Sequence, residues 1–144
     1  MNYQAIRATI EAPLLTAFNS QCPPIPVYFD NVTFVPPDPP NEYVRVNVTF
    51  GLTTEVSLTE SLDNARGALI IRCFARKGAG PARCQEMIQI AVDVLQEIAS
   101  SVKGSTGVFT RIDQITGPDF PAMNAQETHF LGKISTGWKA TVLS

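Results

Sequence analysis

The chain has 144 residues, of which 44% are hydrophobic and 17% charged, and its formal net charge is −2 at pH 7. A chain of this length and composition is expected to fold as one globular domain, residues 1–144, around a single core. The slightly acidic balance argues against a protein whose main task is to grip nucleic acid, although it leaves room for a local basic patch. No apolar run is long enough for a membrane helix and no signal peptide is recognisable, so we expect cytoplasmic synthesis and no membrane partner.

An amphipathic helix is predicted over about residues 2–20. Apolar residues recur there at helical spacing, namely Ile6, Ile10, Leu14, Ala17 and Phe18. Pro13 lies inside this pattern. Because proline removes a hydrogen bond and clashes with the preceding turn, we expect the helix to kink or break near Glu11.

The middle of the chain predicts strands separated by a proline-rich link and a polar segment. A short strand is expected around residues 26–29, followed by a stiff extended link with four prolines. Strict alternation predicts a strand over residues 42–50. Its core face is assigned to Val44, Val46, Val48 and Phe50. Residues 51–67 are polar and are expected to form a protruding hairpin or a long loop, before another strand at residues 68–76.

The second half predicts a long helix and two further strands. The turn at residues 77–81 opens a helix that ends near Lys103, and its apolar stripe comprises Cys84, Ile88, Ala91, Leu95, Ile98 and Val102. Residues 108–115 are expected to form a strand, residues 116–126 a loop, and residues 128–142 the last strand. The core side of the last strand is assigned to Phe130, Ile134, Trp138, Ala140 and Val142. This order of elements predicts an α+β fold, with two helices packed on a mostly antiparallel sheet or sandwich.

Motifs that carry chemistry are weak. Gly132 and Lys133 lack the other residues of a phosphate-binding loop, and no nucleophile motif accompanies His129, the single histidine. Asp93 and Glu97 lie one helical turn apart and are interpreted as a solvated face rather than a catalytic pair. The cysteines have no metal-like spacing and are expected to be reduced thiols: Cys22, Cys73 and Cys84. We therefore expect no enzymatic activity, no metal and no cofactor.

The order of segments resembles the tail terminator-like family of long-tailed bacteriophages. The likeness covers nearly the whole chain and is carried by the segments IPVYFDNVTFVPPDPPNEYVRVNV, RGALIIRCFARKGAGPARCQEMIQIAVDVLQEI, GVFTRI and THFLGKISTGWKATV. It implies a fold shared with tail-tube and neck-joining proteins, and a ring, usually hexameric, that caps the tail tube. Such a ring stops tube growth and offers a joining surface to the head connector.

The resemblance also implies partners and a location. The partners would be copies of the chain itself, the tail tube protein, and a head–tail connector or neck protein, with viral DNA only passing through the lumen. The location would be the tail or neck of the virion, after assembly in the host cytoplasm. Two alternatives stay open: a tail-tube or head-to-tail joining protein, and a small-ligand binding module.

Charge suggests where the contacts of a ring would lie. Five of the eleven basic residues fall between positions 66 and 83, namely Arg66, Arg72, Arg76, Lys77 and Arg83. We expect Arg72 and Arg76 to meet the acidic residues of the 51–67 segment in a neighbouring subunit. Those acidic residues are Glu55, Glu60 and Asp63. The same segment is the candidate for the tube-facing surface, through Thr54, Glu55, Ser57, Thr59 and Glu60.

Overall fold

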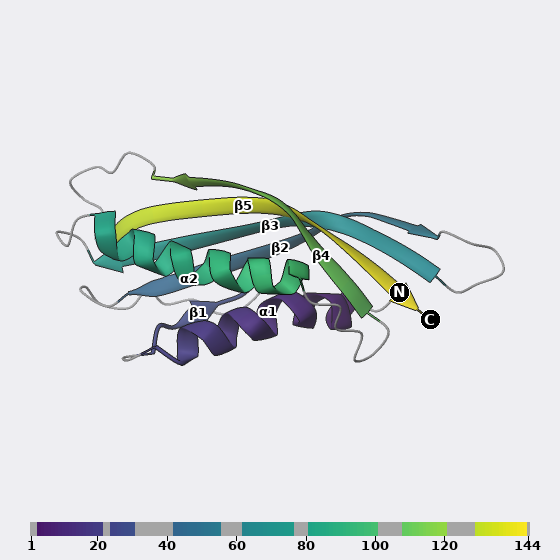
Figure 1. Cartoon of the computed structure of the whole chain (residues 1–144), viewed down its shortest axis with the longest axis horizontal. Helices are drawn as coiled ribbons and strands as arrows, with labels where there is room; N and C mark the ends of the chain where they lie inside the picture. Colours follow the sequence, from purple (N-terminus) through teal and green to yellow (C-terminus); the bar gives the residue numbers. More distant parts are fainter. Residues whose placement is uncertain are drawn as a thin grey trace.

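Two helices cover one face of a five-stranded sheet in the computed structural model (Figure 1). The structure describes residues 3–21, 24–30, 42–55, 62–76, 81–100, 108–120 and 129–143. In chain order the elements are α1 (Tyr3–Asn19), β1 (Val27–Tyr28), β2 (Tyr43–Glu55), β3 (Leu62–Arg76), α2 (Pro81–Ser100), β4 (Val108–Asp119) and β5 (His129–Leu143). The predicted α+β fold, with both helices on a mostly antiparallel sheet, is confirmed.

The strands are arranged in the order β1-β2-β3-β5-β4. β1 runs parallel to β2, whereas β2, β3, β5 and β4 pair antiparallel in turn. Val46, Ile71 and Ile134 face one another across the three central strands, and all three are buried beneath the helices. The core therefore lies between the helices and one face of the sheet.

The strand faces agree with the predicted alternation. The side chains of Val44, Val46 and Val48 are buried and Phe50 packs partly buried against them. In β5 the assigned Ile134, Trp138 and Ala140 are buried and Phe130 is partly buried, whereas the side chain of Val142 lies outside the described residues.

Of the two structures expected for residues 51–67, the protruding hairpin is confirmed and the long loop is wrong. Residues 51–67 are not a long loop, because β2 continues to Glu55, β3 starts at Leu62, and Glu55 pairs with Asp63. β5 pairs with β3 along its whole length, as far as Leu143 opposite Leu62. This third strand satisfies the other edge of β3, so a polar sequence is sufficient to hold extended structure there. Figure 1 shows the hairpin reaching beyond the ends of both helices.

α1 is continuous, and the expected break near Glu11 is wrong. The helix runs through Pro13 from Tyr3 to Asn19. Four stripe residues hold both halves of α1 on the core, and each is 0% exposed: Ile6, Ile10, Leu14 and Phe18. Burying each of these side chains contributes roughly 1.5–3 kcal/mol, so together they outweigh the roughly 3 kcal/mol cost of an internal proline.

α2 lies directly on β5 because one glycine makes room for it. A Cβ at Gly132 would be 2.6 Å from the Cys84 Sγ and 2.7 Å from the Ile88 Cδ1. The stripe from Cys84 to Ile98 is buried as predicted, whereas Val102, Lys103 and Gly104 lie outside the described residues. Neither described helix is long and apolar enough to cross a bilayer.

A second glycine accommodates the tryptophan of the core. Trp138 is 0% exposed and donates its indole N–H to the Ala68 carbonyl at 3.2 Å. A Cβ at Gly67 would lie 2.8 Å from the indole ring and still closer to the Thr49 carbonyl, so only glycine fits between them. The ring of Phe50 meets the indole edge-to-face at 5.0 Å.

β4 includes residues that were expected to form a loop. It extends to Asp119, so residues 116–119 are strand, while residues 121–128 lie outside the described residues. Its register with β5 shifts between Ile112 and Ile115 and again between Thr116 and Asp119, next to Gly117 with φ +110°. Bulges, glycine and proline are tolerated at a sheet edge, where one side of the strand needs no partner.

The two described cysteines are buried free thiols, as expected. Cys84 donates to the Cys73 carbonyl at 3.6 Å. Burial raises the pKa of the Cys84 thiol to about 11, and it raises the pKa of Cys73 further. Both are therefore inert core residues at neutral pH. Cys22 lies outside the described residues.

Candidate interaction surface

Both described helices lie on the same face of the sheet, and we call the opposite face the open face (Figure 1). Side chains that alternate with the buried residues of β2, β3, β5 and β4 project from it. Arg72, one of the site residues expected from the sequence, belongs to this face.

Three cations form a row across the middle of the open face. Arg45 in β2 lies opposite Arg72 in β3, and Arg72 lies opposite Lys133 in β5. We call these residues the central row. Each is partly exposed, and Asp119 of β4 continues the row beyond Lys133. Neighbouring strands are about 4.8 Å apart, so like charges are held at close quarters here.

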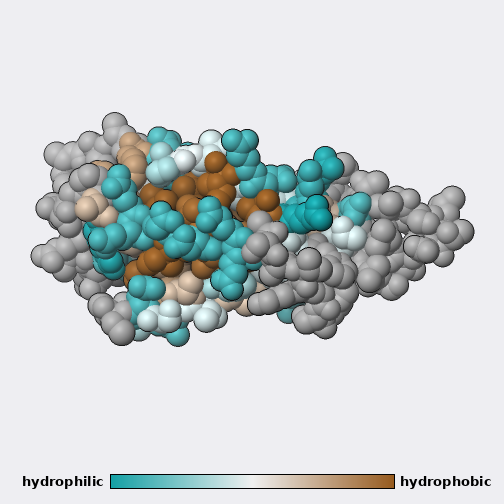
Figure 2. All heavy atoms as spheres, viewed as in Figure 1, coloured by the Kyte–Doolittle hydropathy of each residue, from teal (hydrophilic) through white to brown (hydrophobic). Residues whose placement is uncertain are grey.

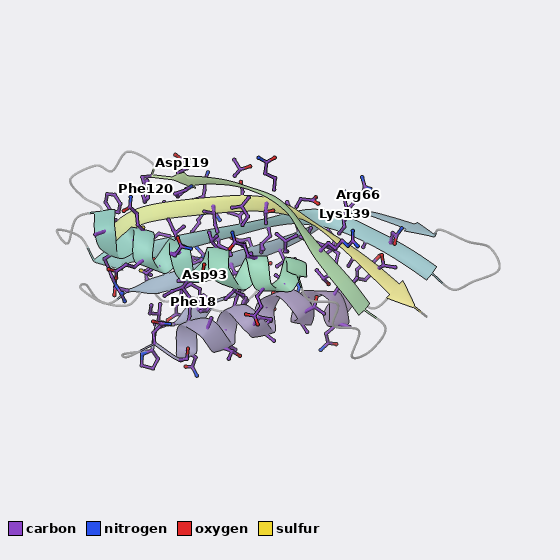
Figure 3. All side chains as sticks on the ribbon, in the orientation of Figure 1. Phe18, Arg66, Asp93, Asp119, Phe120 and Lys139 are labelled. Carbon is purple, nitrogen blue, oxygen red and sulfur yellow. The ribbon has the colours of Figure 1, made fainter. Side chains whose placement is uncertain are left out.

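A second row of cations crosses the open face further along the same strands. Arg66 in β3 lies opposite Lys139 in β5, which in turn lies opposite Arg111 in β4. We call these residues the distal row, and all three are exposed. Figure 3 shows Arg66 and Lys139 close together towards the end of the sheet from which the β2–β3 hairpin projects.

Small residues separate the two rows. Arg66 and Arg72 are six residues apart in β3, which corresponds to roughly 20 Å. The strip between the rows is lined mainly by short side chains: Thr49, Ala68, Ser135 and Gly137. Asp113 lies over Gly137, because a Cβ there would be 2.8 Å from the Asp113 Oδ2, and its Oδ1 lies 3.9 Å from the Lys139 ammonium.

The open face is therefore basic, although the chain is acidic overall. Its described side chains include six cations in the two rows against the carboxylates Asp113 and Asp119. The contact between Lys139 and Asp113 joins half-exposed groups, with 54% and 43% of their side-chain areas accessible. Such an exposed pair contributes little to stability, and the six cations and two carboxylates of this face sum to a charge of +4.

Aromatic rings lie next to the central row, on the side away from the distal row. Tyr43 stacks on Phe74 with 4.4 Å between ring centroids, and Tyr28 meets Tyr43 edge-to-face at 6.0 Å. Tyr43 is only 5% exposed. These rings pack on one another at the end of the central row, where Tyr28 lies opposite Arg45.

Asp30 connects α1 to the central row along the edge of β2. It accepts hydrogen bonds from the Arg7 guanidinium at 2.8 Å, the Val48 amide at 2.8 Å and the Asn47 side chain. Asn47 in turn accepts a hydrogen bond from Arg72 at 2.8 Å. Partial burial works to raise the pKa of Asp30, but the hydrogen bonds from Arg7, Val48 and Asn47 outweigh it and hold that pKa below its ordinary value.

The structure places the two halves of the expected charge contact at opposite ends of β3. Arg72 lies on the open face, and Arg76 ends the strand opposite His129. Glu55 and Asp63 face each other at the other end, about 30 Å from Arg72 along the strand. Thr54 pairs there with Asn64. The side chains of Thr54, Glu55, Asp63 and Arg76, and all of Ser57, Thr59 and Glu60, lie outside the described residues.

The basic segment from residue 66 to 83 does not form one patch. Arg83 lies on α2, where its Nε donates to the Glu42 carboxylate at 2.9 Å and its Nη1 to Glu86 at 3.1 Å. Lys77 lies outside the described residues. Sequence reasoning instead missed the cations that strand pairing brings beside Arg72 and Arg66: Arg45, Arg111, Lys133 and Lys139. Their alternation within each strand was visible, but the register between strands was not.

The helix side of the molecule is polar along α2. Figure 2 shows a hydrophilic band with apolar residues on both sides of it. Asp93 and Glu97 are both exposed on α2, and Gln89 donates to Asp93 at 2.7 Å. The two acids thus occupy a solvated face, as their spacing suggested.

Comparisons with known proteins show a shared fold but no family. No family model matches the chain, and no curated protein matches it either. One solved chain, which bears no descriptive name, superposes with a TM-score of 0.65 at 22% identity, over 97% of this chain and 96% of that one. At this identity the likeness shows a shared fold that spans the full length of both chains.

Proposed function

We propose that the chain is a tail terminator of a long-tailed bacteriophage. In this role it forms a closed ring, most often hexameric, on the end of the tail tube, stops tube growth and presents a joining surface to the head connector. The observation that carries the proposal is the agreement between two levels: the segment order resembles that family over nearly the whole chain, and the fold is the α+β arrangement that the resemblance implies.

The distribution of charge supports head-to-tail contact between copies. One end of the β2–β3 hairpin carries Glu55 and Asp63, and the open face carries Arg72 about 30 Å away. A heterologous contact needs two different surfaces on each subunit, and complementary charge fixes its register. We propose that Arg72 and Arg76 of one subunit meet Glu55, Glu60 and Asp63 of the next.

The hairpin is also the proposed contact with the tube. It projects beyond both helices (Figure 1), so a partner can approach it without disturbing the core. The proposed contact residues are Thr54, Glu55, Ser57, Thr59 and Glu60. This arrangement would leave the remaining faces of the ring for the head connector.

Electron microscopy of the purified protein, with light scattering over a concentration series, tests the assembly. Closed rings of uniform diameter are expected from a heterologous contact that closes by rotation. Open filaments would favour the tail-tube alternative. A strict monomer, even with tube protein added, would leave a small-ligand binding module as the better interpretation, and a ligand-dependent rise in melting temperature would support it.

A further inference from the structure

The distal row is an arrangement that the fold does not need. Arg66, Lys139 and Arg111 occupy directly opposed positions on three neighbouring strands, and all are exposed. Like charges opposite each other destabilise a sheet. Among the side chains that the structure describes, the only carboxylate within 4.0 Å of this row is Asp113, at 3.9 Å from Lys139. The fold thus tolerates repulsion between these three cations, which points to an anionic ligand that binds them.

The shape of the open face favours a long, uniformly charged ligand. The central row repeats the arrangement about 20 Å away, and the residues between the rows are mostly short, such as Thr49, Ala68 and Gly137. A protein partner would normally be anchored by large apolar or aromatic side chains in the middle of the contact. Among the side chains that the structure describes, the strip between the rows offers only the partly buried Ile70 for this purpose.

The side chains also distinguish duplex from single-stranded nucleic acid. Binding of single strands relies on exposed aromatic rings on which bases stack. The described aromatic rings of this face, Tyr28, Tyr43 and Phe74, lie outside the strip and pack on one another, and the side chain of Phe109 lies outside the described residues. Four of the six cations are arginines, whose planar guanidinium suits two phosphate oxygens at once.

We infer that the open face binds the phosphate backbone of double-stranded DNA, with the distal row as its main contact. The binding is independent of base sequence, because phosphate contacts position a protein without reading bases. This inference goes beyond the proposed ring, because the distal row lies about 20 Å from Arg72 and is a separate surface from the proposed contact between subunits. In a ring, such binding would mean that DNA contacts the protein directly instead of only passing through the channel.

The test uses a 30-base-pair duplex of mixed sequence, titrated with the full chain between 50 and 200 mM NaCl. Each phosphate contact contributes about −0.9 to the slope of log K against log[salt]. Three contacts therefore give a slope difference of about −2.7 between the wild type and the variant R66Q/K139Q/R111Q. Between 50 and 200 mM NaCl, the affinity of the wild type should therefore fall by approximately 40-fold more than the affinity of the variant.

The matched control places the same change in net charge on the helix side. Gln4, Gln85 and Gln96 are exposed on α1 and α2, so Q4E/Q85E/Q96E also lowers the net charge by three. The control is expected to keep the wild-type salt slope. R66K/R111K, which keeps the charge, is expected to retain most of the affinity, and the melting temperature shows whether each variant is folded.

Three outcomes would overturn the inference. They are no binding of the duplex by the wild type at 50 mM NaCl, an equal loss in the control and distal-row variants, or binding of polyglutamate as tight as that of DNA. The last result would indicate an acidic protein partner. Sedimentation of the same samples keeps the ring question separate: monomers that bind DNA through the distal row support the inference and contradict the ring.

Discussion

Asp30 is the residue on which the contacts between α1 and the edge of β2 converge. Its carboxylate accepts from Arg7, Asn47 and Val48, and Arg7 also donates to Glu11 at 3.0 Å and to the Val48 carbonyl at 3.2 Å. These bonds cover the β2 edge beyond the end of the two-residue β1. A single side chain thereby holds the helix layer, the sheet edge and, through Asn47, the central row.

Replacing Asp30 by Asn should destabilise the fold by about 2 kcal/mol. One carboxylate oxygen becomes an amide N–H₂ facing other donors, so at least one partly buried hydrogen bond is lost. Because the folded pKa of Asp30 lies below its unfolded value of about 3.9, its contribution is complete above that value and disappears as the pH falls through the folded pKa. Urea unfolding at pH 7, 4 and 3 should show the difference between wild type and D30N shrinking with acidification.

Glu11 provides the control for this pH dependence. Burial raises its pKa more than Arg7 lowers it, so the stabilising contribution from its protonation is present at low pH and is lost as the pH rises through the folded pKa. E11Q should therefore change the acid limb of stability in the opposite sense to D30N. A constant difference between wild type and D30N from pH 7 to 3 would contradict the role given to Asp30.

Gly132 and Gly137 lie on the same strand but should respond differently to alanine. G132A forces a methyl group against Cys84 and Ile88 in the core, and overpacking of this kind costs about 1–3 kcal/mol. At Gly137 the methyl group meets only the exposed Asp113 carboxylate, which can swing away, so G137A should stay within about 0.5 kcal/mol of wild type. Equal denaturation midpoints for the two variants would show that α2 does not press on Gly132.

The elements of the chain show which features the sequence specifies locally. Hydrophobic periodicity was sufficient for α1, α2 and the buried faces of β2 and β5, because burial of those stripes is what holds each element in place. Three features depended on tertiary partners. They are the continuity of α1 through Pro13, the length of the hairpin and the strand structure of residues 116–119. A neighbouring strand or a buried stripe overrides local preferences for a loop or a break.

The candidate surface was predictable only in part, for a related reason. Alternation in β3 correctly placed Arg72 on the face opposite Ile71 and Cys73. Its neighbours Arg45 and Lys133 come from strands 27 and 61 residues away, and their positions depend on the register of β2 and β5. Register follows from the order of the strands, which alternation within one strand does not contain.

The pairing of β3 suggests a variant that tests the contact between subunits. R72E/R76E should abolish ring formation, because in the proposed contact it would place like charges against the acidic hairpin of the next subunit. The melting temperature should change little, since the one described hydrogen bond from Arg72 goes to the partly exposed Asn47. R72K/R76K is the matched control and should still assemble. Intact rings in the charge-reversed variant would refute this assignment of the contact.

The hairpin can be tested as a separate element. Shortening the segment from Glu55 to Glu60 should leave the domain folded, because the buried core cluster lies elsewhere, in the helices and in the strand residues facing them. The shortened protein should fail to cap tubes, so tails overgrow or remain unjoined to filled heads. Tail length is measured by electron microscopy. Tails of normal length would show that the hairpin does not contact the tube.

In the whole molecule, the two faces of the sheet differ in what they contact. The helix-covered face supplies the core, and the open face concentrates six cations in two rows although the chain has a net charge of −2. Separation of this kind gives each subunit a direction, which a head-to-tail ring requires. The proposed ring would end tail growth.

Electron microscopy of phage particles assembled without this protein shows whether the ring ends tail growth. A growing tube exposes at its end the surface that recruits the next ring, so without a terminator the tails should lengthen beyond their normal value or fail to join filled heads. Supplying the wild-type chain should restore tails of uniform length. Tails of normal length, joined to heads in the absence of the protein, would contradict the terminator role.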